Sequence, residues 1–240
     1  MYRFFVNRNE IYDEKIRLSD DDLAHIRVLR IKPNESFVVC DSNGIDYICQ
    51  TEKRDDEYVS IIDKRPSQGE PNVKCVIYTA YAKSGALEYI VQKSVELGAV
   101  EIVFFPTKRS PAIPDDIEKK ITRYNKIALE AAKQSDRGIV PNIKFLPAYE
   151  LAVNEASNAD ISLFLYENEE KNHIKETLER SARANSYSIV TGSEGGFTDD
   201  EAKYAQTNGM ISVSLGKRIL RCETAPVATL SIIMYQTGNM

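Results

Sequence analysis

Two loops near the C-terminal end carry residue types that could bind and activate a small ligand. The first is Gly192-Ser193-Glu194-Gly195-Gly196-Phe197, in which three glycines let the backbone approach a ligand and present its amides. Its spacing matches neither the GxGxxG nor the GxxxxGKS fingerprint, and Glu194 would repel a phosphate. The loop therefore suits a cationic or hydroxyl-bearing ligand, with a simple tight turn between a strand and a helix as the alternative.

The second loop, residues 215–225, concentrates charge just before an apolar helix. Its carboxylate could accept a proton, and its cations could stabilise negative charge that develops on a substrate. A solvated charged loop capped by Thr224 is the alternative, but two unusual loops in one domain favour a binding site. The charged residues lie close together in the chain: Lys217, Arg218, Arg221 and Glu223.

Both loops follow predicted strands of one domain. From residue 73 onward, strand-like and helical segments alternate, which predicts an α/β fold with a mainly parallel sheet. In such sheets ligands bind outside the carboxyl ends of the strands, so the two loops should meet at one edge. The predicted strands are 73–81, 102–107, 143–146, 161–167, 186–192 and 211–215, and the predicted helices are 86–97, 115–134, 148–157, 171–183, 198–207 and 224–237.

The N-terminal part of the chain has a different pattern. Residues 1–65 contain short strand-like runs that are typical of a small β-barrel. Asn43-Gly44 separates two of these runs, and a two-residue turn there would pair Cys40 with Tyr47. The proline- and glycine-containing segment 64–72 then predicts a linker to the second domain.

Composition limits the classes of function. The net charge of −5 and the pI of about 5.3 argue against nucleic-acid binding by bulk electrostatics, so any RNA contact requires a local basic patch. No apolar run approaches the ~20 residues of a membrane helix, and the N-terminus lacks the apolar core of a secretory signal, which predicts a cytoplasmic protein. The four cysteines form no CxxC pair, which predicts reduced structural thiols and no metal site.

The segment GSEGGFTDDE, followed by LGKRILRCETAPVATL, resembles the paired C-terminal motifs of the RsmE family, usually GPEGGF and LGxRILRxETA. Two positions depart from the pattern: Ser193 replaces the usual proline, and Asn34 stands where a glycine often precedes a strand. Neither position demands the family's residue, because Asn tolerates a left-handed backbone and Ser193 needs no fixed φ. Further matches are Gln92-Lys93, Glu96-Leu97-Gly98, Thr107-Lys108-Arg109-Ser110, Glu130-Ala131-Ala132, Gln134, Arg137, Pro141, and His25 with Val28-Leu29-Arg30.

This resemblance implies a fold and a cofactor. Residues 73–240 would form a SPOUT methyltransferase domain with a deep trefoil knot, and residues 1–68 a PUA-like RNA-binding β-barrel. Members of the family usually form homodimers through the knot face and hold S-adenosylmethionine in the knot loops. The implied cofactor residues are Leu165, Tyr166, Glu167, Gly192, Glu194, Gly195, Gly196, Leu215, Gly216, Ile219, Leu220, Arg221, Thr224 and Ala225.

The resemblance also implies a reaction, methylation of N3 of a uridine in 16S ribosomal RNA of the small subunit. We hypothesise that Arg221 is the stabilising cation and that Glu223 is the base or its orienter, with Glu194 a weaker choice. Because N3 is normally used in base pairing, the uracil must be unpaired. The expected RNA contacts are Arg3, Arg27, Arg30, Lys108, Arg109, Gln134 and Arg137.

Three other functions remain open at this point. A SPOUT methyltransferase that acts on transfer RNA would share the two loops but differ in its N-terminal domain. A non-catalytic RNA-binding scaffold would keep the fold without strong cofactor binding. A small-molecule nucleotide enzyme would need a phosphate cradle, which the sequence lacks.

Overall fold

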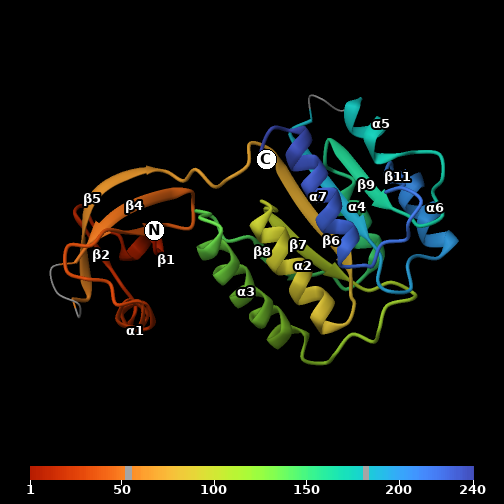
Figure 1. Ribbon diagram of the computed structural model, residues 1–240. Helices are drawn as coiled ribbons and strands as arrows, with labels where there is room; N and C mark the ends of the chain where they lie inside the picture. Colours follow the sequence, from red (N-terminus) through yellow and green to blue (C-terminus); the bar gives the residue numbers. More distant parts are fainter. Residues whose placement is uncertain (52–55, 181–183) are drawn as a thin grey trace. The chain divides into compact units, whose positions relative to one another are not determined.

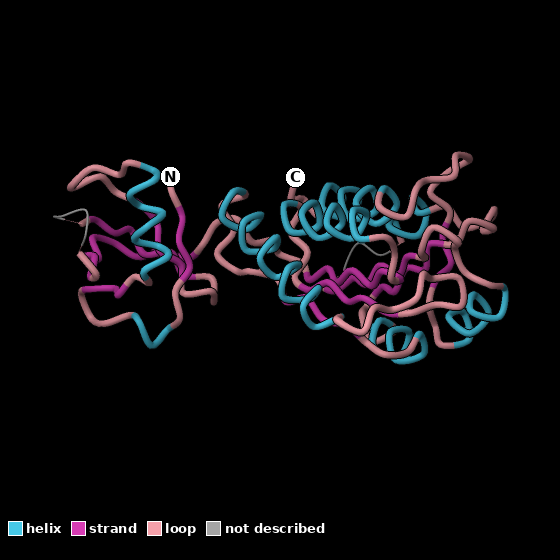
Figure 2. Tube along the Cα trace, turned by 90° about the horizontal axis from the view of Figure 1, so that it is seen from below, coloured by secondary structure: helices cyan, strands magenta, loops and turns pink. Residues whose placement is uncertain are grey.

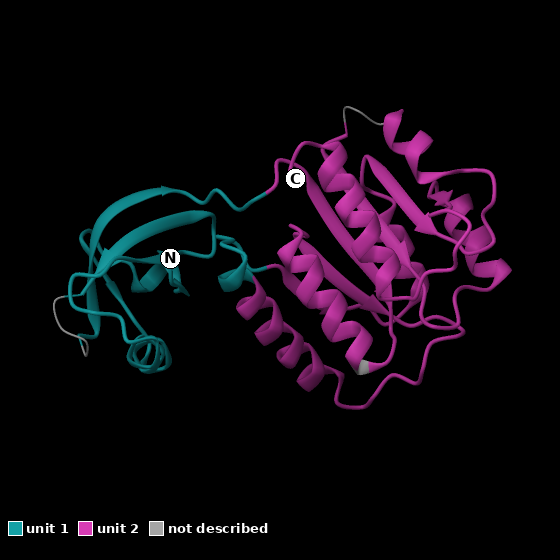
Figure 3. Ribbon diagram, in the orientation of Figure 1, with its two compact units in different colours: residues 1–70, 132–140 teal, residues 71–131, 141–240 magenta. Residues whose placement is uncertain are grey.

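The chain folds into two compact units in the computed structural model (Figure 3), which describes residues 1–51, 56–180 and 184–240. The first unit comprises residues 1–70 and 132–140, and the second comprises residues 71–131 and 141–240. Residues 132–140 therefore group with the N-terminal unit, although the alternating pattern placed them in the α/β domain.

The first unit is a five-stranded sheet that curls over one helix as a half-barrel (Figure 1). Its strand order is β1-β3-β4-β5-β2, in which β1 and β3 are parallel and the remaining pairs antiparallel. Phe4, Phe37 and Ile26 are fully buried in its core. The elements are β1 (Arg3–Phe5), a 3-10 turn (Arg8–Glu10), β2 (Lys15–Arg17), α1 (Asp20–Leu29), β3 (Phe37–Cys40), β4 (Ile45–Gln50) and β5 (Tyr58–Pro66).

The hairpin between β3 and β4 differs from the two-residue turn predicted. Cys40 pairs with Asp46, not with Tyr47, and the four residues 41–44 join the two strands. The Asp41 side chain explains the longer loop: its Oδ1 accepts the N–H groups of Asn43 and Ile45, at 2.8 and 3.1 Å. A shift of one residue exchanges the two faces of a strand, and here it turns Asp46 into the interior.

Asp46 is the buried partner of Arg3. The Arg3 guanidinium donates to both carboxylate oxygens of Asp46, at 2.7 and 2.9 Å, and the hydroxyl of Ser67 donates to the same carboxylate. Burial alone would raise the pKa of Asp46, but the hydrogen bonds from Arg3, Ser67 and Cys40 outweigh it and hold the pKa below its usual 3.8. Arg3 is therefore a structural residue, and its expected role as an RNA contact is corrected.

Replacing Asp46 with asparagine should destabilise the protein by about 3–5 kcal/mol at pH 7, because Arg3 would lose its buried counter-ion and keep only the exposed carboxylate of Asp136, 3.5 Å from its Nε. Since the folded pKa lies below the unfolded pKa, the wild-type advantage is present above about pH 4 and is lost as the pH falls through the folded value. Urea unfolding of both proteins between pH 7 and 3 measures this. An equal loss from Asp13→Asn, an exposed aspartate of the same unit, would contradict the account.

A carboxylate also explains why residues 132–140 belong to the first unit. Glu70 accepts Arg137 Nη2 at 2.6 Å through one oxygen, and the N–H groups of Gly138 and Ile139 at 3.0 Å through the other. The Arg137 side chain is 1% exposed. Its expected role in RNA contact is therefore corrected as well, since its guanidinium is occupied inside the protein.

The second unit is a parallel six-stranded sheet of order β11-β9-β10-β6-β7-β8. The α/β fold class predicted from the alternating pattern is confirmed. Its elements are β6 (Lys74–Ala80), α2 (Ser84–Glu96), β7 (Glu101–Phe105), α3 (Ile117–Gln134), β8 (Asn142–Phe145), α4 (Tyr149–Ala156), β9 (Ile161–Leu165), α5 (Ile174–Glu179), β10 (Ser186–Thr191), α6 (Asp199–Thr207), β11 (Ile211–Val213) and α7 (Thr224–Gln236).

Helices cover both faces of this sheet, as Figure 2 shows. Helices α4 and α6 pack against one face, where Phe105, Phe164 and Val190 are buried. Helix α7 contacts β6, β10 and α2. In α3, the Tyr124 ring meets Phe104 edge-on, with ring centroids 5.1 Å apart. Among the described residues, no helix combines the length and the apolar character needed to cross a membrane.

Candidate functional site

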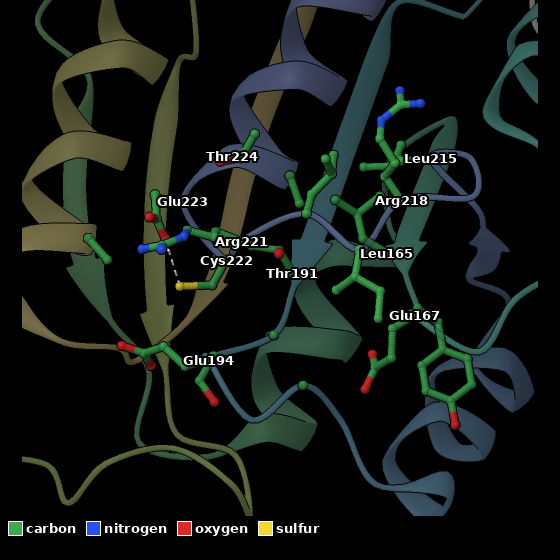
Figure 4. A pocket seen from close by; sticks show the side chains of 18 of the residues that line it. Leu165, Glu167, Thr191, Glu194, Leu215, Arg218, Arg221, Cys222, Glu223 and Thr224 are labelled. Carbon is green, nitrogen blue, oxygen red and sulfur yellow. Dashed lines mark hydrogen bonds between the residues drawn. The ribbon is translucent and has the colours of Figure 1, made fainter.

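A cavity of about 1180 Å³ opens at the carboxyl edge of the parallel sheet (Figure 4). Because all named strands of the sheet are parallel, the loops that follow β6, β9, β10 and β11 meet there. Residues 192–196 of the glycine loop and residues 214–225 both line the cavity. The structure thus brings together the two loops that the sequence placed at one edge.

The glycine loop, residues 192–197, folds back on itself. The N–H of Gly196 donates to the carbonyl of Ser193 at 3.0 Å, and Gly196 has a φ of +65°. A Cβ on Gly192 would lie 3.0 Å from the Cα of Gly196, so any larger residue there would require the loop to shift by a few tenths of an ångström. Its amide-bearing backbone therefore forms part of the cavity wall.

Glu194 is exposed, and its side chain links the glycine loop to the start of α2 by a hydrogen bond. Its Oε1 accepts the N–H of Lys83, which precedes α2, at 3.1 Å. Lys83, Gly85, Ala86 and Tyr89 line the same cavity. The sequence motifs did not indicate these residues, which lie just before and in the first turns of α2. Their position directly after the central strand β6 could have predicted them, because ligands bind at the carboxyl ends of parallel strands.

The charged loop presents Arg221 and Glu223 together. Figure 4 shows these side chains with Cys222 on the side of the cavity that faces α2, whereas Arg218 extends away from them. The carbonyl of Arg221 accepts the N–H groups of Thr224 and Ala225, each at 3.0 Å, and so fixes the loop at the start of α7. The helix begins at Thr224 itself, so the proposed cap by the Thr224 side chain is wrong.

Leu165, Tyr166 and Glu167 form the opposite wall of the cavity. Leu165 is buried at the end of β9, and the Tyr166 hydroxyl donates to Asp199 of α6 at 2.7 Å. A Cβ on Gly196 would clash with the Glu167 carboxylate, so this acidic group lies directly over the glycine loop. The wall offers an apolar surface and a carboxylate side by side.

The four cysteines are free and buried, as expected for reduced structural thiols. Burial raises the pKa of Cys49, Cys75 and Cys222 to about 12, and at Cys222 a hydrogen bond to Glu223 at 3.3 Å adds to this. Burial raises the pKa of Cys40 further still.

These thiols should therefore react slowly with Ellman's reagent in the folded protein at pH 8, because the thiolate is the reactive form. Denaturation should release all four at once. The time course of absorbance at 412 nm, with and without guanidinium chloride, measures both. A native thiol that reacts at the rate of a small-molecule thiol would contradict the burial described.

The remaining expected RNA contacts are exposed. Lys108 and Arg109 follow β7: Arg109 Nη1 donates to the carbonyl of Gly195 in the glycine loop at 3.1 Å, and Lys108 Nζ lies 3.4 Å from the Asp200 carboxylate of α6. Arg27 and Arg30 lie at the end of α1 in the first unit, and Gln134 ends α3. These side chains can reach a ligand from solvent, which Arg3 and Arg137 cannot.

Sequence comparisons place this site among known proteins. Residues 69–234 match a family model described as an RNA methyltransferase domain, and residues 18–64 match an RNA methyltransferase PUA domain. The ribosomal RNA small subunit methyltransferase E of Mesomycoplasma hyopneumoniae is 35% identical over 96% of this chain and 98% of its own length. This chain belongs to the ribosomal RNA small subunit methyltransferase E family.

Other members of the methyltransferase E family agree over the full chain. The Bacillus subtilis enzyme is 30% identical over 99% of this chain and 97% of its own. A solved structure of the Neisseria gonorrhoeae enzyme, bound to S-adenosylmethionine, is 26% identical with a TM-score of 0.86 and covers 98% of this chain and 97% of its own. The similarity to this structure therefore extends over both units of the chain.

Proposed function

We propose that this chain uses S-adenosylmethionine to methylate N3 of one uridine in 16S ribosomal RNA, acting in the cytoplasm on the small ribosomal subunit as a homodimer. The observation that carries the proposal is the convergence of the glycine loop, Arg221 and Glu223 on one cavity. In this proposal residues 1–68 bind RNA and residues 73–240 carry out the methyl transfer.

The cavity residues fit S-adenosylmethionine by shape and charge. The backbone of Gly192 and Gly196 lines the cavity without a Cβ in front of it, where its polar groups could contact an adenine, and Leu165, Leu215 and Ala225 supply apolar flanks. Carboxylates around the cavity suit a ligand with a sulfonium charge and ribose hydroxyls. The volume of about 1180 Å³ exceeds the 300–1,000 Å³ usual for one small ligand, which leaves room for a base beside the cofactor.

When bound, the cofactor supplies an electrophilic methyl group, and the protein must prepare the nitrogen that attacks it. We assign Glu223 to accept the N3 proton and Arg221 to stabilise the negative charge that spreads onto the uracil oxygens. Glu194 suits the role of base less well, because Lys83 already occupies one of its oxygens. Positioning of the two reactants supplies a further part of the rate.

Lys108, Arg109, Arg27, Arg30 and Gln134 are the RNA contacts that we propose, since their side chains are exposed. The net charge of −5 limits the electrostatic contribution to RNA binding. The dependence of RNA affinity on salt concentration should therefore correspond to the release of only a few counter-ions. Arg3 and Arg137 are left out of this set because both are buried in ion pairs.

Transfer of a radioactive methyl group from S-adenosylmethionine tests the substrate class. Small ribosomal subunits from a strain without the native enzyme should accept label, whereas bulk transfer RNA should not. Label in transfer RNA alone would favour the other SPOUT specificity. Cofactor binding without transfer to either RNA would contradict the proposed substrate, and absence of cofactor binding would favour a scaffold.

A further inference from the structure

The turn Thr107–Ser110 is a closed structure that displays two cations. The hydroxyls of Thr107 and Ser110 lie 2.8 Å apart, and Ser110 Oγ accepts the N–H of Thr107 at 3.1 Å. The N–H of Ser110 in turn donates to the carbonyl of Thr107 at 3.2 Å. These bonds fix the backbone of the turn and leave the side chains of Lys108 and Arg109 exposed.

Both the side chain and the main chain of Arg109 are hydrogen-bonded to the glycine loop. Its guanidinium donates to the carbonyl of Gly195 at 3.1 Å, and its own carbonyl accepts the hydroxyl of Ser193 at 3.2 Å. Ser193 is only 5% exposed, so water competes little for this second bond. A Cβ on Gly195 would lie 2.8 Å from the Cβ of Arg109, which shows how tightly the two segments pack.

The neighbouring residue anchors the turn to the helix that follows the glycine loop. The main-chain N–H of Lys108 donates to Oε1 of the buried Glu201 at 2.8 Å. The other oxygen of Glu201 accepts the N–H of Thr198 at 2.8 Å and closes the capping box of α6. The turn is therefore hydrogen-bonded to the glycine loop and to α6. A movement of the glycine loop must displace Arg109 or break its hydrogen bonds with the loop.

We propose that the turn Thr107–Ser110 binds a backbone phosphate of the RNA, and that Ser193 couples this turn to the cofactor site. The inference rests on the proposed function, because it assigns the glycine loop to S-adenosylmethionine. A ligand that orders Gly192 and Gly196 also orders Arg109, whose remaining N–H groups suit a phosphate. Linkage makes the effect reciprocal: each ligand strengthens the binding of the other by the same factor.

Limited proteolysis measures this coupling without any turnover. Trypsin cuts after Arg109 only when the turn opens, so the cleavage rate reports the open population. S-adenosylmethionine at saturation should slow the appearance of the fragment ending at Arg109 by about fivefold or more in the wild-type protein. In Ser193→Ala this protection should be lost even at a cofactor concentration that calorimetry shows to saturate the variant.

A second measurement separates positioning from simple stability. In steady-state assays with small ribosomal subunits at saturating cofactor, Ser193→Ala should raise the KM for the subunits about fivefold, a larger factor than any loss in kcat. Ser193→Thr, which keeps the hydroxyl, should restore both the protection and the KM. The matched control is Ser157→Ala at the end of α4, which also removes one bond from a serine hydroxyl to a carbonyl but lies away from the glycine loop.

The outcomes are distinct. If wild-type protein binds S-adenosylmethionine and gains no protection at Arg109, the coupling is wrong and the proposed function stands. Full protection in Ser193→Ala, or an equal loss in Ser157→Ala, would also overturn the role of Ser193. Absence of cofactor binding by calorimetry would remove the proposed function and this inference together.

Discussion

Arg221→Ala should lower kcat about 100- to 1,000-fold, the usual cost of removing a group that stabilises developing negative charge. The guanidinium lies with Glu223 on the side of the cavity that faces α2, opposite Leu165 and Glu167 (Figure 4). Its backbone carbonyl, which accepts the N–H groups of Thr224 and Ala225, is retained in the variant. The Kd for S-adenosylmethionine should therefore stay within about threefold of wild type, a difference below 1 kcal/mol.

Single-turnover methyl transfer to small ribosomal subunits, combined with calorimetry, separates these two effects. Arg218→Ala is the matched control, because it removes a cation from the same loop whose side chain extends away from Glu223. It should retain most of the activity. Near-normal turnover by Arg221→Ala would contradict the role of Arg221. An equal loss in the Arg218 variant would instead indicate a general cationic field in place of one positioned guanidinium.

Gly192→Ala should weaken binding of S-adenosylmethionine about 5- to 150-fold. The added methyl group would lie 3.0 Å from the Cα and 3.1 Å from the carbonyl carbon of Gly196, and 3.3 Å from the buried ring of Phe197. Backbone atoms cannot turn aside as a flexible side chain can, so the glycine loop must move. Overpacking of this kind costs about 1–3 kcal/mol, which gives the stated range in Kd.

The control for this variant comes from the same cavity. Gly85 also lines it, but a Cβ there would meet no atom within 4 Å, so Gly85→Ala should leave the apo structure undisturbed. Thermal unfolding of both variants without ligand checks that the fold survives. Equal cofactor affinity for Gly192→Ala and wild type would mean that the loop, as described, is not the cofactor wall.

Much of the fold could be predicted from the sequence because its signals are local. The alternation of β-branched runs and amphipathic segments after residue 73 placed the strands of the parallel sheet close to their observed bounds. Thr198 and Glu201 have the spacing of a capping box, a signal that is also local, and the structure forms this box at the start of α6. The helix predicted at 171–183 is shorter, Ile174–Glu179, and its last three predicted residues lie outside the described residues.

Predictions from the sequence were wrong where hydrogen bonds from another residue, often distant in the chain, determine the turn or the burial of a side chain. The Asn43-Gly44 pair predicts a two-residue turn, but the hydrogen bonds of Asp41 stabilise a longer loop and shift the register. Arg3 and Arg137 look like surface cations in the sequence. Their burial depends on Asp46 and Glu70, carboxylates more than forty residues away in the chain, and no periodicity reveals such a pairing.

The site was predictable in outline and not in detail. The unusual composition of the two loops, and their position after strands, indicated one cavity at the carboxyl edge of the sheet. The tie between Glu194 and Lys83 and the bonds between Ser193 and Arg109 join segments that are far apart in sequence. The roles given to Arg221, Glu223 and the cofactor residues remain predictions for the experiments described.

The most direct test of the proposed methylation of uridine N3 is mass spectrometry of nucleosides from small ribosomal subunits. The subunits should come from a strain without the native enzyme and be incubated with the purified protein and S-adenosylmethionine. We predict the appearance of 3-methyluridine in 16S ribosomal RNA, formed about 100- to 1,000-fold more slowly when Arg221→Ala replaces the wild-type protein. A methyl group on another base or atom, or no methyl group despite cofactor binding, would contradict the proposed reaction.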